Sequence, residues 1–178
     1  MKAWLVLFFL LAAACGAAAQ ELGEWHDRAA VATTQLIGVD GKPVHIGDFR
    51  GKAVVIDFWG AWCASCLAEM GSMKQLQDTL ADRRGHVAFL FVSVEDKGFE
   101  KDAAWFKASG LGGASYRWQK RTGEQYHAFF RTSNARWWVP DAMILDPEGN
   151  IAKVIMGSGT DWTKEADSIR GLLNASGS

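Results

Sequence analysis

Two cysteines separated by two residues, Cys63 and Cys66, are the side chains in this sequence best suited to chemistry. A thiolate attacks disulfides and binds metal ions, so a C-x-x-C pair fits redox exchange, a metal site or a structural disulfide. A structural disulfide stabilises mainly by closing a long loop in the unfolded chain. Two intervening residues close almost no loop, which makes a purely structural disulfide the weakest interpretation.

A metal site needs more ligands than this pair supplies. A closed zinc site takes four ligands, usually two cysteine pairs or one pair with histidines. The histidines of the chain are scattered without ligand spacing: His26, His45, His86 and His127. We therefore expect no resident metal ion. A copper-binding chaperone, with His127 as the third ligand, stays open as an alternative.

Redox exchange is favoured by the segment around the pair. The apolar run 53–59 predicts a strand buried on both faces, and apolar residues at helical spacing from Met70 to Leu80 predict a helix. Cys63 then lies at a helix N-terminus, where unpaired N–H groups and the helix dipole favour a thiolate. Cys66, one turn later, faces the same side and is more shielded, which suits a resolving thiol.

Two carboxylates lie close to the cysteines in the sequence. Asp57 lies in the predicted strand, where burial would raise its pKa and let it exchange a proton with Cys66. Glu69 follows Cys66 by three residues and could do the same. The alternatives are an edge aspartate that faces solvent and an ordinary exposed helix charge. We expect a proton relay through one or both carboxylates.

The remaining pattern predicts a single α/β domain. Strands and helices alternate after the hairpin-like stretch 38–52, which implies parallel strands joined by right-handed crossovers. The stretch 111–138 is the least regular, with a short strand near Tyr116 and a helix within 122–131. The other expected strands are 29–37, 53–59, 86–94, 142–146 and 151–156, and the other expected helices lie at 70–80, 99–106 and 162–173.

The segment "DGKPVHIGDFRGKAVVIDFWGAWCASCLAEM", residues 40–70, resembles the exported TlpA/ResA-type thiol–disulfide oxidoreductases of the thioredoxin-like superfamily. That family carries D-G-K-x-V, a G-K before the strand, and then F-W-x-x-W-C-x-x-C-x-x-E. The likeness extends loosely over residues 33–174. It implies a thioredoxin-like fold, with a central mixed sheet flanked by helices and an N-terminal β-hairpin extension. It also implies that Cys63 is the nucleophile and Cys66 the resolving thiol.

A second segment, "VPDAMILDPEGN" (139–150), matches the part of the family where a cis-proline precedes a strand and a turn. By that match Pro140 is cis and stands opposite Cys63. The backbone of Val139 would then pair with an extended substrate as a short strand addition. The alternative is a trans proline at the start of a strand, because only about 5–6% of X–Pro bonds in folded proteins are cis.

Tryptophans frame the predicted site. By the family pattern Trp62 shields the disulfide and offers an apolar contact, whereas Trp59 packs in the core. Trp138 is a candidate substrate platform, with core packing as the alternative. The sequence departs from the pattern at Gly71, where family members usually carry a proline, and at Asp57, since many members lack an acid on this strand.

The first nineteen residues differ in composition from the rest. Lys2 precedes an apolar run and an A-x-A site before Gln20, which predicts a secretory signal peptide at 1–19 and a single domain at 20–178. A lipoprotein signal that ends before Cys15 and an uncleaved membrane anchor are the alternatives. Each places the domain in the periplasm or another extracytoplasmic space, where disulfides persist.

Composition and resemblance together narrow the partners. The 178 residues carry a net charge of −1 with no basic run, which gives no electrostatic footprint for nucleic acid. The resemblance implies an exported protein substrate with a disulfide or dithiol, a membrane thiol electron donor, and no cofactor beyond the Cys63–Cys66 disulfide. It favours reduction of substrate disulfides, for example in cytochrome c maturation. A disulfide-forming oxidase is a further alternative.

Overall fold

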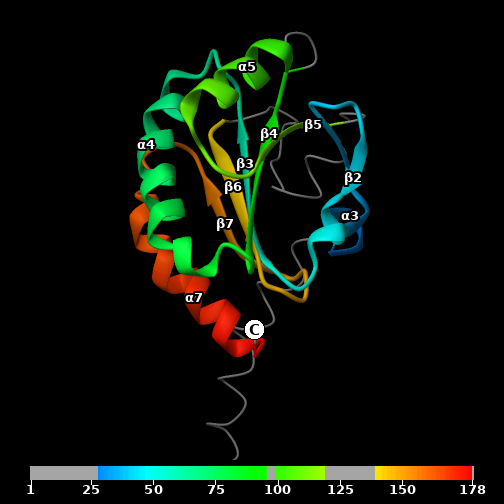
Figure 1. Cartoon of the computed structure of the whole chain (residues 1–178), viewed down its shortest axis with the longest axis vertical. Coiled ribbons are helices and arrows are strands. Elements are labelled where there is room, and N and C mark those ends of the chain that lie inside the picture. The colour runs from blue at the N-terminus through cyan, green and yellow to red at the C-terminus, as the bar shows by residue number, and fades with distance from the viewer. Residues whose placement is uncertain (1–27, 96–98, 119–138, 178) are drawn as a thin grey trace, which may run out of the picture.

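A seven-stranded mixed sheet forms the centre of the computed structural model, which describes residues 28–95, 99–118 and 139–177 (Figure 1). The strand order is β2-β1-β5-β4-β3-β6-β7. β3, β4 and β5 run parallel, whereas β6 pairs antiparallel with β3 and β7 antiparallel with β6. The strands are β1 (Gln35–Gly38), β2 (Pro43–His45), β3 (Ala53–Trp59), β4 (Val87–Ser93), β5 (Ala114–Trp118), β6 (Asp141–Leu145) and β7 (Ile151–Met156).

Helices cover both faces of this sheet and define two cores. Side chains of α4, α5 and α7 pack on one face, and α3 packs on the other (Figure 1). Among the described residues no helix is long and apolar enough to cross a membrane. The helices are α3 (Arg28–Thr33), α4 (Ala64–Thr79), α5 (Phe99–Ser109) and α7 (Glu165–Ala175), with 3-10 turns η1 (Ile46–Phe49), η2 (Ala81–Arg83) and η3 (Trp162–Lys164).

β3 is buried along its whole length, as its apolar run predicted. Successive side chains on a strand point to opposite faces. Val55 and Trp59 therefore pack with α4 and α7, whereas Ile56 and Phe58 pack in the core on the α3 side. By the same alternation Asp57 belongs to the face that α4 covers, which is the face that holds the cysteines.

The expected strand at 29–37 is wrong in its first part. Residues Arg28–Thr33 form α3, and only Gln35–Gly38 form β1. Alanine has the highest helix propensity, and the alanine-rich sequence of α3 lets it form one short turn of helix that buries Val31. The N-terminal hairpin itself is confirmed, with Leu36 of β1 opposite Val44 of β2.

The other expected elements in the described residues are confirmed to within a few positions. The thioredoxin-like arrangement of a mixed sheet flanked by helices is therefore the fold of this chain. The helix expected within 122–131 lies outside the described residues. α4 runs through Gly71 without a break, and the glycine is exposed there.

We expect Gly113→Ala to lower the free energy of unfolding by about 1–3 kcal/mol. Gly113, just before β5, has φ +93°, and an added Cβ would collide with the carbonyl oxygen of Phe89. Gly71→Ala is the matched control, because an added Cβ at Gly71 meets nothing within 4 Å. Alanine in this helix should raise the free energy of unfolding by roughly 0.5–1 kcal/mol. Urea denaturation followed by tryptophan fluorescence measures the free energy of unfolding of both variants. Equal effects of the two substitutions would contradict the expected collision at Gly113.

Candidate active site

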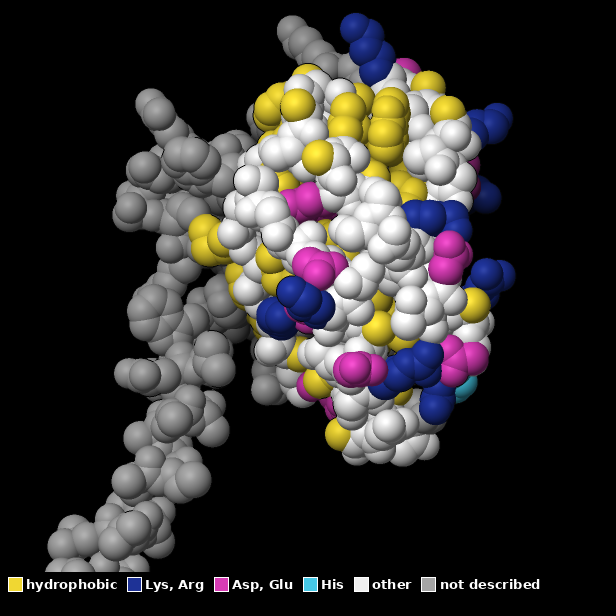
Figure 2. Space-filling model, turned by 90° about the vertical axis from the view of Figure 1, so that its left-hand side faces the viewer, with side chains coloured by type: hydrophobic (Ala, Val, Ile, Leu, Met, Phe, Trp, Pro, Cys, Tyr) yellow, Lys and Arg dark blue, Asp and Glu magenta, His cyan; other side chains and the backbone are white. Residues whose placement is uncertain are grey.

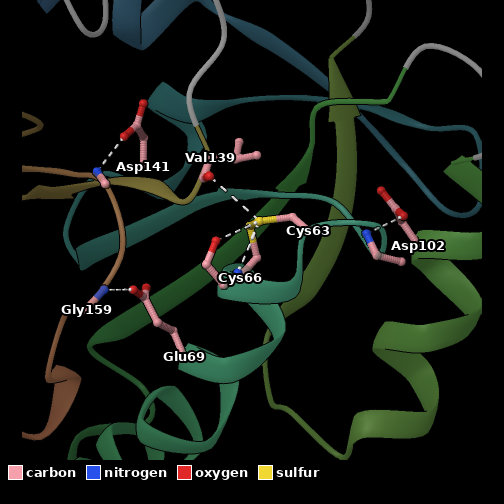
Figure 3. Close-up of a disulfide and its surroundings, with 10 residues drawn as sticks. Cys63, Cys66, Glu69, Asp102, Val139, Asp141 and Gly159 are labelled. Atoms are coloured by element: carbon pink, nitrogen blue, oxygen red, sulfur yellow. Dashed lines mark hydrogen bonds between the residues drawn. A yellow bond between two sulfur atoms is a disulfide. The ribbon is translucent and has the colours of Figure 1, made fainter.

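A disulfide between Cys63 and Cys66 lies in the first turn of α4 (Figure 3). Cys63 is the N-cap residue, and its Sγ accepts a hydrogen bond from the backbone N–H of Cys66 at 3.1 Å. The turn from Gly60 to Cys63 joins β3 to α4 and is closed by a 3.0 Å bond from the N–H of Cys63 to the carbonyl of Gly60. The strand-then-helix placement predicted for the cysteines is confirmed.

Cys66 is more shielded than Cys63, as expected. Cys63 retains 5% of its surface accessible and Cys66 only 1%. The sulfur of Cys63 also lies 3.4 Å from the hydroxyl of Ser65 and 3.7 Å from the carbonyl oxygen of Val139. An incoming reactant therefore meets Cys63 before Cys66.

The Val139–Pro140 peptide bond is cis, as the family match predicted. Pro140 is buried and Val139 half-buried. Figure 3 shows Val139 facing the disulfide from the opposite side to α4, with its carbonyl oxygen directed at Cys63. A segment more than seventy residues away in the sequence thus forms one wall of the site.

Asp57 is buried on β3, with 5% of its surface accessible, so the alternative of a solvent-facing edge aspartate is wrong. Burial raises its pKa from the ordinary 3.8 to about 8, and the nearby charges of Glu69 and Asp141 act in the same direction. A carboxyl group with such a pKa is protonated over most of the neutral range and can release its proton near pH 8. This suits the proton exchange expected of Asp57.

Glu69 reaches across to the loop that follows β7. Its Oε1 accepts hydrogen bonds from the N–H groups of Gly159 at 2.5 Å and Thr160 at 3.2 Å. Glu69 is therefore a half-buried, backbone-bound carboxylate rather than a free surface charge. An open cleft of about 380 Å³ separates α4 from this loop. Its lining comprises Ser65, Ala68, Glu69, Ser72, Ser158, Gly159, Thr160 and Asp161.

Sequence reasoning missed two buried carboxylates beside the site. Asp141 directly follows Pro140 and accepts a hydrogen bond from the N–H of Gly157 at 2.9 Å. Asp102, in the first turn of α5, accepts one from the N–H of Ala61 at 2.9 Å. The sequence contains a signal for Asp102, since it lies three residues after Phe99 on the apolar stripe of α5. A carboxylate on such a buried stripe is unfavourable unless it has hydrogen-bond partners.

Trp62 is the most exposed tryptophan of the described residues, with 62% of its surface accessible beside Cys63. Trp59 is fully buried and packs on Trp105 at 5.3 Å between ring centroids, as expected of a core residue. Figure 2 shows apolar side chains gathered near the upper end of the α4 side, with charged side chains scattered over the rest of this face. Trp138 lies outside the described residues.

In the described ranges no group of three or more His, Cys, Asp or Glu side chains is arranged to hold a metal ion. His127, the third ligand considered for copper, lies outside those ranges.

The family model described as Redoxin matches residues 25–170. Thioredoxin-like protein YneN of Bacillus subtilis is 39% identical over 57 residues, which is 32% of this chain and 34% of that protein. Thiol-disulfide oxidoreductase ResA of Geobacillus thermodenitrificans is 25% identical over 137 residues, covering 76% of this chain and 73% of the relative.

Solved structures agree with the fold. A thiol:disulfide interchange protein of the thioredoxin family from Chlorobium tepidum superposes with a TM-score of 0.59 at 25% identity, covering 76% of this chain and 91% of that one. A DsbF homologue from Corynebacterium diphtheriae superposes with a TM-score of 0.58 at 22% identity, over 85% of this chain and 90% of that one. The second likeness shows the fold alone.

We expect stability to fall with rising pH because of Asp57. The folded protein holds this proton up to about pH 8, whereas the unfolded chain releases it near pH 3.8. The stabilisation is fully present below the unfolded pKa and is lost as the pH rises through the folded pKa, by up to about 1.4 kcal/mol per pH unit. Asp57→Asn, which keeps the shape and cannot ionise, should remove this slope. Urea denaturation of wild type and variant, both oxidised, between pH 4 and 9 measures this slope. Parallel plots of the free energy of unfolding against pH would contradict the raised pKa of Asp57.

Proposed function

Because the chain belongs to the Redoxin family, we propose that it is a thiol–disulfide oxidoreductase of the TlpA/ResA type that reduces disulfides of exported proteins. The observation that carries the proposal is the placement of the disulfide. Cys63 lies at the N-terminus of α4, beside the carbonyl of Val139 and cis-Pro140, and Cys66 lies behind it.

In the proposed reaction the dithiol form of the enzyme supplies two electrons. The Cys63 thiolate attacks one sulfur of a substrate disulfide, that S–S bond breaks, and the departing substrate thiolate takes up a proton. Cys66 then loses its proton and attacks the sulfur of Cys63 in the mixed disulfide, which releases the second substrate thiol. The enzyme is left with the Cys63–Cys66 disulfide, and the substrate with two thiols.

Local geometry supports Cys63 as the attacking thiol. It is the more exposed of the pair, and its sulfur already accepts the N–H of Cys66 at 3.1 Å. The positive end of the α4 dipole adds to this donor, and both favour the thiolate. The backbone of Val139 is suited to pair with an extended substrate, and the exposed ring of Trp62 offers an apolar contact beside it.

The proton that Cys66 loses needs an acceptor in a buried site. We assign this role to Asp57, on the sheet face that carries the cysteines, because its pKa of about 8 is close to that of a thiol. Asp57 would take the proton when Cys66 attacks and return it when the enzyme disulfide is reduced. Glu69 acts with it through its negative charge, which raises the pKa of Asp57.

The proposed location and partners are supported by the sequence and by the likeness to the relatives, and not by the geometry of the site. The signal peptide expected at 1–19 would deliver the domain to the periplasm or another extracytoplasmic space, with a lipid or membrane anchor as the alternative. A membrane thiol protein there would restore the dithiol form after each cycle. Apocytochrome c, which needs reduced cysteines, is an example of a fitting substrate.

We expect reduced Cys66→Ser to accumulate a mixed disulfide when it is mixed with a disulfide-containing model protein such as insulin. Cys63 can still attack, but no second thiol remains to resolve the adduct. Cys63→Ser is the matched control and should form far less adduct, because Cys66 is shielded. Non-reducing electrophoresis with mass spectrometry measures the adducts. Absence of an adduct with Cys66→Ser, or equal amounts in both variants, would argue against the proposed roles.

The direction of electron flow is tested by the reduction potential. A protein that reduces substrate disulfides should equilibrate with glutathione or dithiothreitol at roughly −300 to −200 mV, in the range of reductants rather than oxidases. Tryptophan fluorescence follows the equilibrium, because Trp62 directly precedes Cys63 and Trp59 lies at the end of the strand before it. A value near −120 mV would instead favour a disulfide-forming oxidase.

A further inference from the structure

Asp102 of α5 is hydrogen-bonded to the turn that carries Cys63. It is 2% exposed, and its Oδ1 accepts the N–H of Ala61 at 2.9 Å, two residues before the nucleophile (Figure 3). The same turn is closed from inside by the bond from the N–H of Cys63 to the carbonyl of Gly60. The N–H groups of Ala61 and Cys63 are therefore both hydrogen-bonded, the first to α5 and the second within the turn.

Asp102 is itself oriented by a second contact. The hydroxyl of Ser93, at the end of β4, donates to its Oδ2 at 2.5 Å, and the same hydroxyl accepts the N–H of Glu95 at 3.1 Å. A hydrogen-bonded chain thus runs from the end of β4 through Asp102 to Ala61. Burying a carboxylate is costly unless its lone pairs are satisfied, and here both oxygens are bound to donors.

The hydrogen-bonded chain through Asp102 to Ala61 affects the position of the Cys63 sulfur. The position of that sulfur depends on the backbone of the turn, because Cys63 is both its last residue and the N-cap of α4. The 3.1 Å bond from the N–H of Cys66 requires the cap geometry to be held. If Ala61 were released, the turn could move and this donor would stabilise the sulfur less.

We propose that Asp102 is a positioning residue that holds Cys63 where its thiolate is best stabilised. The proposal rests on the proposed function only in taking Cys63 as the attacking thiol. Position and charge act in opposite directions here. A nearby negative charge alone disfavours a thiolate, whereas a correctly held turn favours it. Removing Asp102 should therefore lower the thiolate population of Cys63 if position matters and raise it if only charge matters.

The experiment compares four variants of the reduced protein with wild type. Asp102→Ala removes the acceptor, whereas Asp102→Asn keeps a side-chain oxygen for Ala61 and removes the charge. Ser93→Ala leaves Asp102 in place but removes the hydroxyl that donates to its Oδ2. Glu100→Ala is the matched control, an exposed acid in the same turn of α5. The pH dependence of iodoacetamide alkylation reports the Cys63 thiolate without any substrate, and equilibration with glutathione reports the reduction potential.

Asp102→Ala should leave the thiolate about tenfold less populated at a pH below its pKa. The reduction potential, measured at a pH above that pKa where the thiolate is the main reduced form, should become about 30 mV more negative. Ser93→Ala should shift both in the same direction by a smaller factor, and it decides the question if Asp102→Ala does not fold. Asp102→Asn should stay within about twofold of wild type, and Glu100→Ala should match wild type.

Two outcomes would overturn the proposal. If Asp102→Ala and Asp102→Asn both increase the thiolate population, the charge matters and the position does not. If the acceptor-removing variants lower only the unfolding temperature and leave the alkylation profile unchanged, Asp102 is merely structural. The proposed function fails separately, through the absence of an adduct with Cys66→Ser, because alkylation of Cys63 does not depend on a protein substrate.

Discussion

Strand pairing around β3 is the constraint on which the site depends. β3 pairs with β4 along its whole length and with β6 from Val54 to Phe58, so it can neither slide nor rotate without breaking two ladders. Its end determines where the turn to α4 begins, and hence where the helix N-terminus and Cys63 lie. β6 brings cis-Pro140 and Val139 to the same end of β3, because it runs antiparallel to it.

Buried acids around this strand are accommodated in two different ways. Asp102 and Asp141 accept hydrogen bonds from backbone N–H groups, which satisfy carboxylate oxygens in place of water. Asp57 instead lies in a setting that disfavours its charge, so that its pKa rises to about 8. The first arrangement suits a residue that holds a loop in place, and the second suits a residue that gains and loses a proton.

Much of this architecture could be predicted from local patterns in the sequence. Continuous apolar runs identified β3 and β4, helical spacing identified α4, and the C-x-x-C pair with its flanking residues identified the cysteine site. α3 was mistaken for a strand because its apolar residues occupy too short a run to distinguish the two periods. The cis-proline came from the family match, since nothing in the residues alone distinguishes cis from trans.

The contacts that tune the site were beyond such patterns, because each joins distant segments. Glu69 binds Gly159 from 90 residues away, and Asp102 binds Ala61 across 41 residues. Such pairs depend on how α4, α5 and the loop after β7 pack in space. No local periodicity encodes that packing, although an acid on the apolar stripe of α5 was a visible warning.

The two margins of the sheet have a consequence for the kind of chain this protein can engage. At one margin, β2 has only three residues and begins with Pro43, which lacks a backbone N–H. At the other margin, β7 carries Lys153, which is paired with Glu165, and its pairing with β6 is irregular in register. In the described residues both margins thus bear features that discourage a further strand. The proposed pairing of an extended substrate with the backbone of Val139, beside the sulfur of Cys63, therefore meets little competition from the sheet margins.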